Sequence, residues 1–594
     1  MSTSISVNKR SVSELLKSGT KHMFIIPEYQ RSYAWGEEQC RTLWDDLVNF
    51  NAQNEESTYF LGTIVSCEND IKEYEIIDGQ QRITTLFLLL RAIYKKLESM
   101  SESDAVLNFR KQIEPCIWDV NPITGKVDDF SKIHIASRVI TDTDNEIFSD
   151  ILKTGSATEK RNDNYSTNYL LFKKWVDELA KDEPMNWYMF CKKILQDCIL
   201  LPIQCDNQDT ALTIFSTLND RGLPLSDSDI FKAKIYNYLD DADKNSFIGE
   251  WKELDNSTED AGIKIQDLFY QYMFYLRALK NDRDTTTPGL RKYFALDKFA
   301  QLYEKSLMTD LSLLADLWRA INNREEIVDE DWSKNIGIKK ALDCLKSYPN
   351  EFWKYPIVTY YLTHRKNMDF KDKFAIFLNR FFAFICVKYI NTPTINAVKK
   401  EILNINSEII KTDSPNFYIS IDDKENLRNG VGNPHKNTVR MILKALAYIK
   451  QDDLLPEKWE IEHLLPQKWQ TTSLFGYNKK DVEHLIEQIG NKIPFEKKLN
   501  IQAGNKYFHN KKIEYAKSTI AIVKELSTIA SDDWSPTDIQ TRTNEIKDTI
   551  ITLFESYNVF ENQKNSAIIT PEEQKVLNNL KARGINLEIN GSCG

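Results

Sequence analysis

The chain has few cysteines and no pattern that would make them metal ligands. Its 594 residues include nine cysteines, and no two stand as a Cys-x-x-Cys pair, which excludes the common zinc ribbons and knuckles. Nine cysteines in a chain of this length are also too few for a disulfide scaffold. The sequence therefore predicts a reduced protein of about three to five domains that relies on hydrophobic cores.

Long apolar runs are lacking as well. The most membrane-like stretch, residues 374–390, contains Asn379, Arg380 and Lys388 and is shorter than the roughly 18 clean apolar residues that indicate a span. The first 16 residues lack the apolar stretch of a signal peptide. We therefore expect a cytoplasmic protein with no membrane partner, in which residues 374–390 form a buried helix.

Positive charge is in deficit over the whole chain. The formal net charge is −10, which argues against a protein coated in nucleic acid but leaves a local basic patch open. Two familiar phosphate-binding patterns are missing too, since neither the GxxxxGKS/T loop nor the Rossmann glycine fingerprint occurs. A nucleotide site in this chain must therefore be built in another way.

A tight turn stands between a predicted hairpin and a predicted helix. Residues 60–67 and 74–78 are short β-forming runs joined by a polar turn, and helical spacing of apolar side chains begins near Thr84. Between them lies the run Asp78-Gly79-Gln80-Gln81-Arg82, in which glycine permits a sharp turn and arginine can fork onto phosphate near a helix N-terminus. The residues alone leave two interpretations open: a phosphate site, or a buried Asp–Arg pair that fastens the turn.

A second group of chemical interest lies near the C-terminus. Glu462 and His463 are adjacent on a short β-like run that ends at Pro466, and Asn500 follows downstream. Carboxylate and amide oxygens hold hard cations such as Mg²⁺, and a neutral imidazole takes a proton from water. These residue types suit a one-metal nuclease, although a histidine after a glutamate is by itself more often a surface residue.

The charge of the following segment supports this interpretation. From Asn491 to Lys517 the sequence has seven lysines against two glutamates, interleaved with aromatic residues. Lysines near a phosphate site supply attraction that is sensitive to salt and independent of sequence. A solvated basic helix would look similar, so the pattern supports the nuclease interpretation without deciding it.

The C-terminal pattern resembles a known family. The run EHLLP, then Gly490-Asn491, then Asn500 and a basic helix, resembles the His-Me-finger (HNH) nucleases, and most closely the C-terminal domain of GmrSD-like modification-dependent restriction enzymes. The resemblance implies a ββα-metal fold that holds one divalent cation, Mg²⁺ or Mn²⁺. The sequence departs from many relatives in having Glu rather than Asp before the histidine.

The resemblance also implies residue roles. His463 would be the general base, Asn491 would brace the catalytic loop, and Glu462 and Asn500 would be the metal ligands. Weaker candidates for metal or phosphate contacts are Asn505, His509, Lys511 and Lys512.

The N-terminal motifs resemble the other half of the same family. YQRSYAW, FLGTI, DGQQRITTL and NDRGLPLSDSDIFK are similar to the GmrSD N-terminal domain, which is related to ParB and sulfiredoxin-like folds. The resemblance implies that Asp78, Gly79, Gln80, Gln81 and Arg82 form a nucleotide site for ATP or GTP. The residues implied as further DNA or nucleotide contacts are Tyr29, Gln30, Arg31, Trp35, Asn219, Arg221, Gly222, Asp229 and Lys232.

Together these observations predict a mixed α+β, predominantly helical protein. We expect a ParB-like α/β sensor and nucleotide-binding domain (1–240), an all-helical middle (241–425), an HNH nuclease domain (426–560) and a polar tail (561–594). The implied function is a phage-defence DNA endonuclease, with NTPase activity, that senses modified phage DNA. One such centre cuts one strand, so double-strand cleavage would need a homodimer or two nicks.

Two alternatives remain open at this point. The chain could be a ParB-like, nucleotide-dependent DNA-binding module that does not cut. It could also be a toxin-like nuclease without modification sensing.

Overall fold

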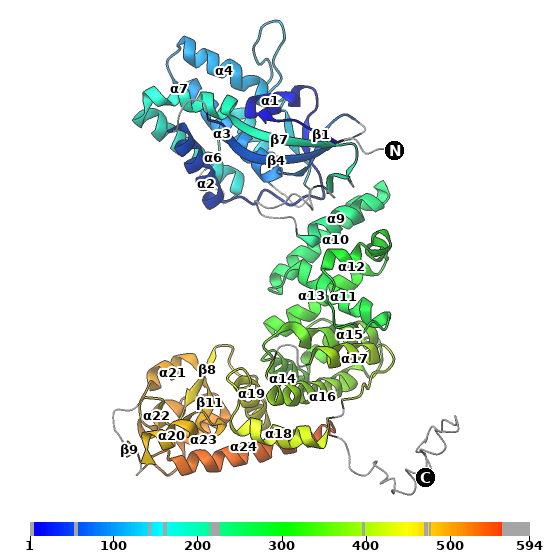
Figure 1. Ribbon diagram of the computed structural model, residues 1–594, viewed down its shortest axis with the longest axis vertical. Helices are drawn as coiled ribbons and strands as arrows, with labels where there is room; N and C mark the ends of the chain where they lie inside the picture. The colour runs from blue at the N-terminus through cyan, green and yellow to red at the C-terminus, as the bar shows by residue number, and fades with distance from the viewer. Residues whose placement is uncertain are drawn as a thin grey trace, which may run out of the picture. The chain divides into compact units, whose positions relative to one another are not determined.

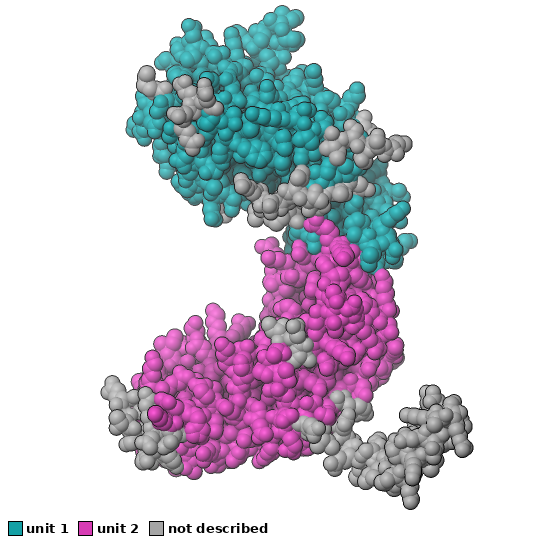
Figure 2. Space-filling view, viewed as in Figure 1, with its two compact units in different colours: residues 1–256, 294–308 teal, residues 257–293, 309–594 magenta. Residues whose placement is uncertain are grey.

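The computed structural model of the chain divides into two compact units (Figures 1 and 2). Unit 1 comprises residues 1–256 and 294–308, and unit 2 comprises residues 257–293 and 309–594. The structure describes residues 5–52, 57–69, 71–139, 144–158, 163–208, 210–212, 214, 226–394, 398–417, 419–468, 473–474 and 477–560. The predicted polar tail, 561–594, lies outside these residues.

A mixed β-sheet forms the framework of unit 1. The strand order is β1-β7-β4-β5-β3-β6, with β2 also paired to β7. The hairpin predicted at residues 60–67 and 74–78 is confirmed, because β4 and β5 pair antiparallel. β4 also runs parallel to β7, and β3 runs parallel to both β5 and β6. The strands are β1 (Ile5–Val7), β2 (Arg10–Ser11), β3 (Phe24–Ile26), β4 (Tyr59–Glu68), β5 (Tyr74–Asp78), β6 (Ile135–Ser137) and β7 (Cys198–Cys205).

Helix α3 (Gln80–Ser99) is the central helix of unit 1 and is apolar on nearly all sides. It begins one turn before Thr84, because Gly79 adopts a left-handed φ of +86° that turns the chain directly from β5 into the helix. Hydrophobic spacing does not show this first turn, since its residues Gln80 and Gln81 are polar yet buried. Around it lie α1 (Val12–Lys17), η1 (Ser18–Thr20), α2 (Glu37–Asn51), α4 (Asp104–Ile117), α5 (Asn145–Thr154), α6 (Asn164–Asp182), α7 (Pro184–Lys192) and η2 (Lys193–Asp197).

Ser226 and Asp227 are residue types that cap helices, and the sequence after them predicts a helix through Tyr238, where the structure has helix α9. Ser226 accepts a hydrogen bond from the Asp229 backbone N–H, and the Asp229 side chain accepts one from the Ser226 backbone N–H, which forms a capping box. The helices that follow the sheet in unit 1 are α9 (Asp227–Tyr238), α10 (Asp241–Asp260) and η3 (Leu296–Tyr303).

The first part of unit 2 is helical among its described residues, as predicted. α16 (Phe370–Asn391) is the one described helix that is long and apolar enough to cross a membrane by length and composition. Most of its apolar side chains are buried, and it packs against α14 and α18, which agrees with the predicted core helix. The other helices here are α11 (Ile265–Leu279), α12 (Leu290–Phe294), α13 (Leu307–Asn323), η4 (Asp331–Lys334), α14 (Ile336–Leu345), η5 (Glu351–Trp353), α15 (Lys354–His364), α17 (Lys399–Ile409), α18 (Ile421–Gly432) and α19 (Val439–Lys450).

The remainder of unit 2 is built on a two-stranded hairpin. β8 (Trp459–His463) pairs antiparallel with β11 (Lys492–Glu496), so that His463 stands opposite Lys492. α21 (Lys497–Ala503) follows β11 directly. The other elements are β9 (Ser473–Leu474), β10 (Tyr477–Asn478), α20 (Lys479–Ile486), η6 (Ile489–Asn491), α22 (Phe508–Tyr515), α23 (Ala521–Ser527) and α24 (Pro536–Ser556).

The contact between η6 and α24 leaves no room for a side chain at Gly490. A Cβ at this position would overlap the Ile539 carbonyl oxygen and the Thr543 hydroxyl, and would lie 2.7 Å from the Thr543 backbone nitrogen. We predict that Gly490→Ala lowers the free energy of unfolding of unit 2 by about 1–3 kcal/mol, as overpacking does, measured by thermal or urea unfolding. The matched control is Gly289→Ala in the same unit, where an added Cβ meets no described atom within 4 Å. Equal stability of the two variants would contradict the prediction.

Candidate functional site

The hairpin separates the two residues of the Glu462-His463 pair. Successive side chains of a strand point to opposite faces, so Glu462 shares its face with Glu460, while His463 lies on the other. Glu460 and Glu462 contact α21 and α22, whereas His463 contacts the loop after β8 and the end of α20. The two residues therefore act in different surroundings.

The His463 imidazole is neutral at neutral pH. Its Nε2 lies 3.3 Å from the Gln467 amide nitrogen and 3.8 Å from a Glu487 carboxylate oxygen. Burial, followed by the positive charge of Lys492, lowers the pKa of His463 to about 4. A neutral imidazole that keeps some contact with solvent can accept a proton from water, which is the property a general base needs.

Asn491 braces the loop that follows His463. Its amide donates to the carbonyls of Leu465 (3.0 Å) and Ile486 (3.1 Å), and its side-chain oxygen accepts from the Leu465 N–H (2.7 Å). The side chain is fully buried. Its hydrogen bonds are thus directed to the backbone, so the structure gives Asn491 a positioning role and not a chemical one.

Glu462 is engaged inside the protein by two side chains of α22. One carboxylate oxygen accepts a hydrogen bond from the Lys511 ammonium at 2.6 Å and one from the Tyr515 hydroxyl at 3.0 Å. Lys511 also donates to the backbone carbonyl of His463 at 2.6 Å. Lys511 is 1% exposed and has these partners inside the protein, and its predicted contact with metal or phosphate stays a prediction.

Asn500 contacts a carboxylate that the sequence analysis did not select. Its amide nitrogen donates to Glu460 at 3.1 Å, and Lys497 lies 3.7 Å from the other oxygen of that carboxylate. The signal was present in the sequence, because residues two apart on a strand share a face. Glu460 therefore belongs with Glu462 and Asn500 to one oxygen-bearing face.

These residues fit a hard divalent cation by donor type. Carboxylate oxygens and an amide oxygen are the ligands that Mg²⁺ and Mn²⁺ prefer, and water fills the other positions. The buried Glu462 carboxylate already binds the Lys511 ammonium, so this face accommodates a positive charge. Within the described part of the chain, no group of three or more His, Cys, Asp or Glu residues is arranged for a metal, so such a site would rely on Asn500 and water.

The lysines of residues 491–517 are largely compensated by acids. Several of these acids come from outside the segment. A count of lysines and glutamates within residues 491–517 alone therefore overstates the local positive charge. Lys512 also donates to the Ile529 carbonyl at 2.7 Å, so its predicted phosphate contact is not supported, and His509 pairs with Asp532 at 3.0 Å. Asn505 donates to the Lys468 carbonyl. The ion pairs are Lys492–Glu487 (2.7 Å), Lys497–Glu460 (3.7 Å), Lys511–Glu462 (2.6 Å), Lys512–Asp532 (3.7 Å) and Lys517–Glu514 (2.9 Å).

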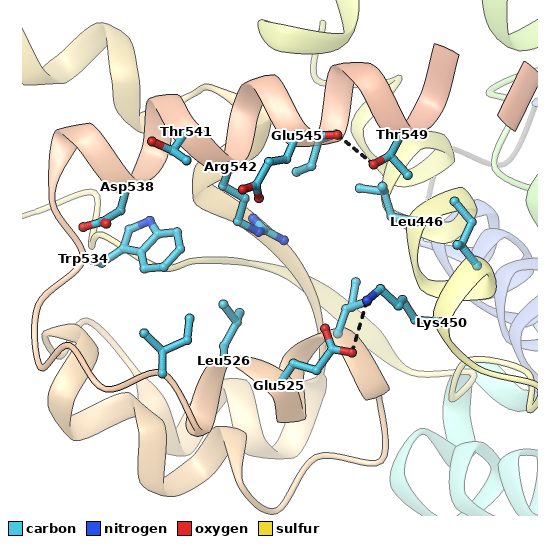
Figure 3. A pocket seen from close by; sticks show the side chains of 14 residues that line it. Leu446, Lys450, Glu525, Leu526, Trp534, Asp538, Thr541, Arg542, Glu545 and Thr549 are labelled. Atoms are coloured by element: carbon cyan, nitrogen blue, oxygen red, sulfur yellow. Dashed lines mark hydrogen bonds and ion pairs between the residues drawn. The ribbon is translucent and has the colours of Figure 1, made fainter. Parts of the chain in front are cut away.

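A cavity of about 560 Å³ lies behind the hairpin, among α19, α23 and α24 (Figure 3). Arg542 on its wall donates to the carbonyls of Gly490 (2.8 Å) and Lys492 (3.0 Å). These carbonyls belong to the residues on either side of Asn491, so Arg542 of α24 fixes the backbone that positions the Asn491 side chain. Trp534 lines the same cavity, and its buried indole N–H has no described partner.

In unit 1 the DGQQR turn is held against β4. Arg82 donates to the Thr63 carbonyl at 2.8 Å, and a Cβ at Gly62, where φ is +120°, would lie 2.8 Å from the Arg82 guanidinium carbon. Burial raises the pKa of Asp78, while the nearby charges of Arg82 and Arg31 lower it. The structure thus brings one acid and two arginines from two motifs close together.

The glutamines of this region have different roles. The Gln81 side-chain oxygen accepts from the backbone N–H groups of Ala34 (2.7 Å) and Trp35 (3.1 Å), and Gln30 donates to the Ile77 carbonyl at 3.2 Å. Both residues join the YQRSYAW and DGQQR motifs and do not face a ligand. Gln80 differs, because its buried side-chain oxygen has no partner among the described residues.

The aromatic residues of the first motif are also internal. Tyr29 is buried, accepts a hydrogen bond from Gln208 and lies 5.6 Å from the Tyr236 ring. Trp35 packs partly buried on the core, and its carbonyl accepts from the Asn168 amide at 2.7 Å. Tyr29 is thus internal while Trp35 keeps part of its surface exposed, and the predicted contacts of both with DNA or nucleotide stay predictions.

The third motif is only partly described. Asn219, Arg221 and Gly222 lie outside the described residues. Asp229 is used in the cap of α9, and Lys232 is buried with its ammonium 5.8 Å from the centre of the Trp251 ring. The structure thus gives both residues contacts within the α9 and α10 pair, and their predicted part in the nucleotide site stays a prediction.

Comparison with protein families places both halves of the chain. The model of the GmrSD restriction endonuclease N-terminal domain matches residues 12–236, and that of the C-terminal domain of these enzymes matches residues 418–549. The chain belongs to the GmrSD restriction endonucleases. No curated protein gives a significant match.

Membership of this family settles the general activity. A restriction endonuclease of phage defence has DNA as its substrate. The N-terminal match contains the YQRSYAW and DGQQR motifs, and the C-terminal match contains the β8–β11 hairpin with His463.

The burial of Lys232 in this endonuclease leads to a prediction about stability and pH. Burial lowers the pKa of Lys232 to about 8, below its ordinary value of about 10.4. The folded state then binds fewer protons than the unfolded state between these pH values, so stability rises with pH there and the buried charge is a cost at pH 7. We predict that Lys232→Met raises the free energy of unfolding by about 1–3 kcal/mol at pH 7 and by less at pH 10.

The measurement is urea unfolding at both pH values. Lys234→Met, on the same helix but with a more exposed side chain, is the matched control. If the increase in the free energy of unfolding of Lys232→Met is as large at pH 10 as at pH 7, the buried charge of Lys232 is not the cause of that increase.

Proposed function

We propose that this endonuclease hydrolyses DNA by a metal-dependent HNH mechanism in unit 2, under the control of a nucleotide-binding sensor in unit 1. The observation that carries the proposal is the neutral His463 imidazole at the end of β8, backed by an oxygen-bearing face on the same strand. The order β8, β11, α21 agrees with a ββα-metal unit.

His463 is the general base of the proposed reaction. Its neutral imidazole accepts a proton from a water molecule as that water attacks the phosphorus of the phosphodiester. Gln467 and Glu487 orient the ring, and Asn491 and Arg542 hold the backbone on either side of it. Mg²⁺ or Mn²⁺, when bound by oxygens of Glu462, Asn500 and Glu460, supplies charge stabilisation to the phosphate and the leaving oxygen.

The proposed nucleotide site is the turn between β5 and α3. The first backbone N–H groups of a helix have no partner within the helix and attract anions, and Gly79, packed closely against Thr63 and Ile64 of β4, makes the turn at which they begin. Arg82 is fixed through one nitrogen to Thr63, which leaves other N–H groups for a phosphate. The Gln80 side-chain oxygen, which has no partner among the described residues, is suited to accept a hydrogen bond from the bound ATP or GTP.

Sensing of modified phage DNA is the expected role of unit 1, with nucleotide as the control. The binding-module alternative predicts no cleavage, and the toxin-like alternative predicts equal cleavage of modified and unmodified DNA. Membership of the restriction endonuclease family favours an active nuclease over a binding module. One centre cuts one strand, so double-strand cleavage would use a homodimer or successive nicks.

We predict that His463→Ala strongly reduces plasmid nicking in Mg²⁺ or Mn²⁺, because it removes the proposed general base. A loss of about 10²–10⁴-fold is typical for removal of a general base. His484→Ala, an exposed histidine on α20, is the matched control and should nick like the wild type. Unchanged nicking by His463→Ala, or none by either protein, would refute the mechanism.

We also predict that Arg82→Ala loses nucleotide binding, because the guanidinium is the phosphate-binding group of the turn. Binding of fluorescent ATP and GTP analogues and NTP turnover are the measurements, and thermal unfolding confirms the fold. Arg41→Ala, an exposed arginine on α2, is the control. Retained turnover in a folded Arg82→Ala protein would leave the alternative of a turn-fastening Asp–Arg pair.

A further inference from the structure

The Glu462–Lys511 contact suggests how the nuclease centre is restrained. We propose that the Lys511 ammonium is a resident cation at Glu462, which the catalytic divalent metal must displace. This inference rests on the proposed metal-dependent function and adds a regulatory step to it.

The first argument is electrostatic. Glu462 is 7% exposed, and an ionised carboxylate in such a place needs a positive partner. Lys511 supplies it at 2.6 Å, and the Tyr515 hydroxyl, one turn later on α22, donates to the same oxygen. α22 thus holds the cation in place.

The second argument is competition for the same oxygens. Glu460 and Asn500 lie on the same face as Glu462, and this face is the proposed site of the divalent cation. An ammonium 2.6 Å from the carboxylate and a divalent cation on that carboxylate repel each other strongly at such range. Binding of the metal therefore requires Lys511 to leave Glu462.

The third argument concerns what Lys511 does when displaced. Displaced Lys511 loses its ion pair to Glu462 and its hydrogen bond to the His463 carbonyl. Its displacement therefore changes the contacts of the backbone at the end of β8, next to the proposed general base. The freed ammonium needs another anion, and the phosphate of the DNA substrate is one. Metal and DNA then bind with positive coupling, because each stabilises the state in which Lys511 has left Glu462.

The first test is Mn²⁺ affinity, measured on the full chain by electron paramagnetic resonance without DNA. Lys511→Met removes the competitor and leaves a buried carboxylate in need of a cation, so we expect Mn²⁺ to bind about tenfold tighter or more than in the wild type. Mn²⁺ should also raise the Tm of Lys511→Met more than that of the wild type. Lys498→Met, an exposed lysine on α21, is the matched control and should match the wild type. Equal or weaker affinity of Lys511→Met would overturn the proposal.

The second test uses the wild-type protein and does not depend on the folding of a variant. Reductive methylation followed by mass spectrometry reports the accessibility of each lysine. Lys511 should be protected without metal and should react several-fold faster in saturating Mn²⁺. Lys193, buried in unit 1 with its ammonium on the Phe50 carbonyl, is the internal control and should stay protected. Continued protection of Lys511 in saturating Mn²⁺ would overturn the exchange.

The two proposals fail in different ways. A wild-type protein that binds no Mn²⁺ would refute both the metal-dependent mechanism and the exchange. A protein that binds Mn²⁺ and nicks through His463, yet shows unchanged affinity in Lys511→Met and protected Lys511, would refute the exchange alone.

Discussion

The antiparallel register of β8 and β11 determines the arrangement of the nuclease centre. With His463 opposite Lys492, the period-two alternation puts the imidazole on one face and the two carboxylates on the other. A slip of one residue would exchange these faces and bury the base in place of Glu462. Asn491, Arg542 and the close packing at Gly490 all fix the backbone at the end of the hairpin where the register is set.

Charge compensation is the second constraint on this centre. Lysines 492, 497, 511 and 512 pair with acids that lie between 5 and 49 residues away, so the local excess of positive charge does not form an open basic surface. The burial of Lys511 against Glu462 costs desolvation of both charges, and such pairs are weak contributors to net stability. The Lys511–Glu462 pair contributes little net stability and contacts strand β8. It is therefore suited to regulate the proposed nuclease centre, because other charges can replace Lys511 at a small cost in folding free energy.

In the proposed nucleotide site of unit 1, different residues have different structural roles. The side chains of Gln81 and Gln30 form hydrogen bonds between the YQRSYAW and DGQQR motifs, which are some 45 residues apart in the sequence. These bonds position Arg31 near Asp78 and Arg82. Gly79 then provides the turn, Arg82 donates to the Thr63 carbonyl, and the Gln80 side-chain oxygen has no partner among the described residues. The residues of these motifs thus differ, because most join parts of the fold and Gln80 keeps an oxygen that the described residues do not engage.

The sequence by itself determined the features whose physical signals are local. Strand alternation and turn composition predicted the β4–β5 hairpin, Ser226 predicted the start of α9, and the motifs in their order indicated both halves of a GmrSD restriction endonuclease. Residues 422–436 are rich in turn formers, a composition that favours a loop or a domain boundary, yet most of this segment is helix α18, because Ser420 caps the helix and it packs against α16 and α24.

Only the tertiary structure decided which chemical groups meet. The pairing of Asn500 with Glu460, and of Lys511 with Glu462, depends on how α21 and α22 fold back onto β8. Burial similarly gives Lys232, Lys511 and Gln81 partners inside the protein, which their positions in the sequence do not show. Partners 40 or more residues apart leave no local periodicity in the sequence, and the ionic state of a side chain depends on the surroundings that only the folded chain provides.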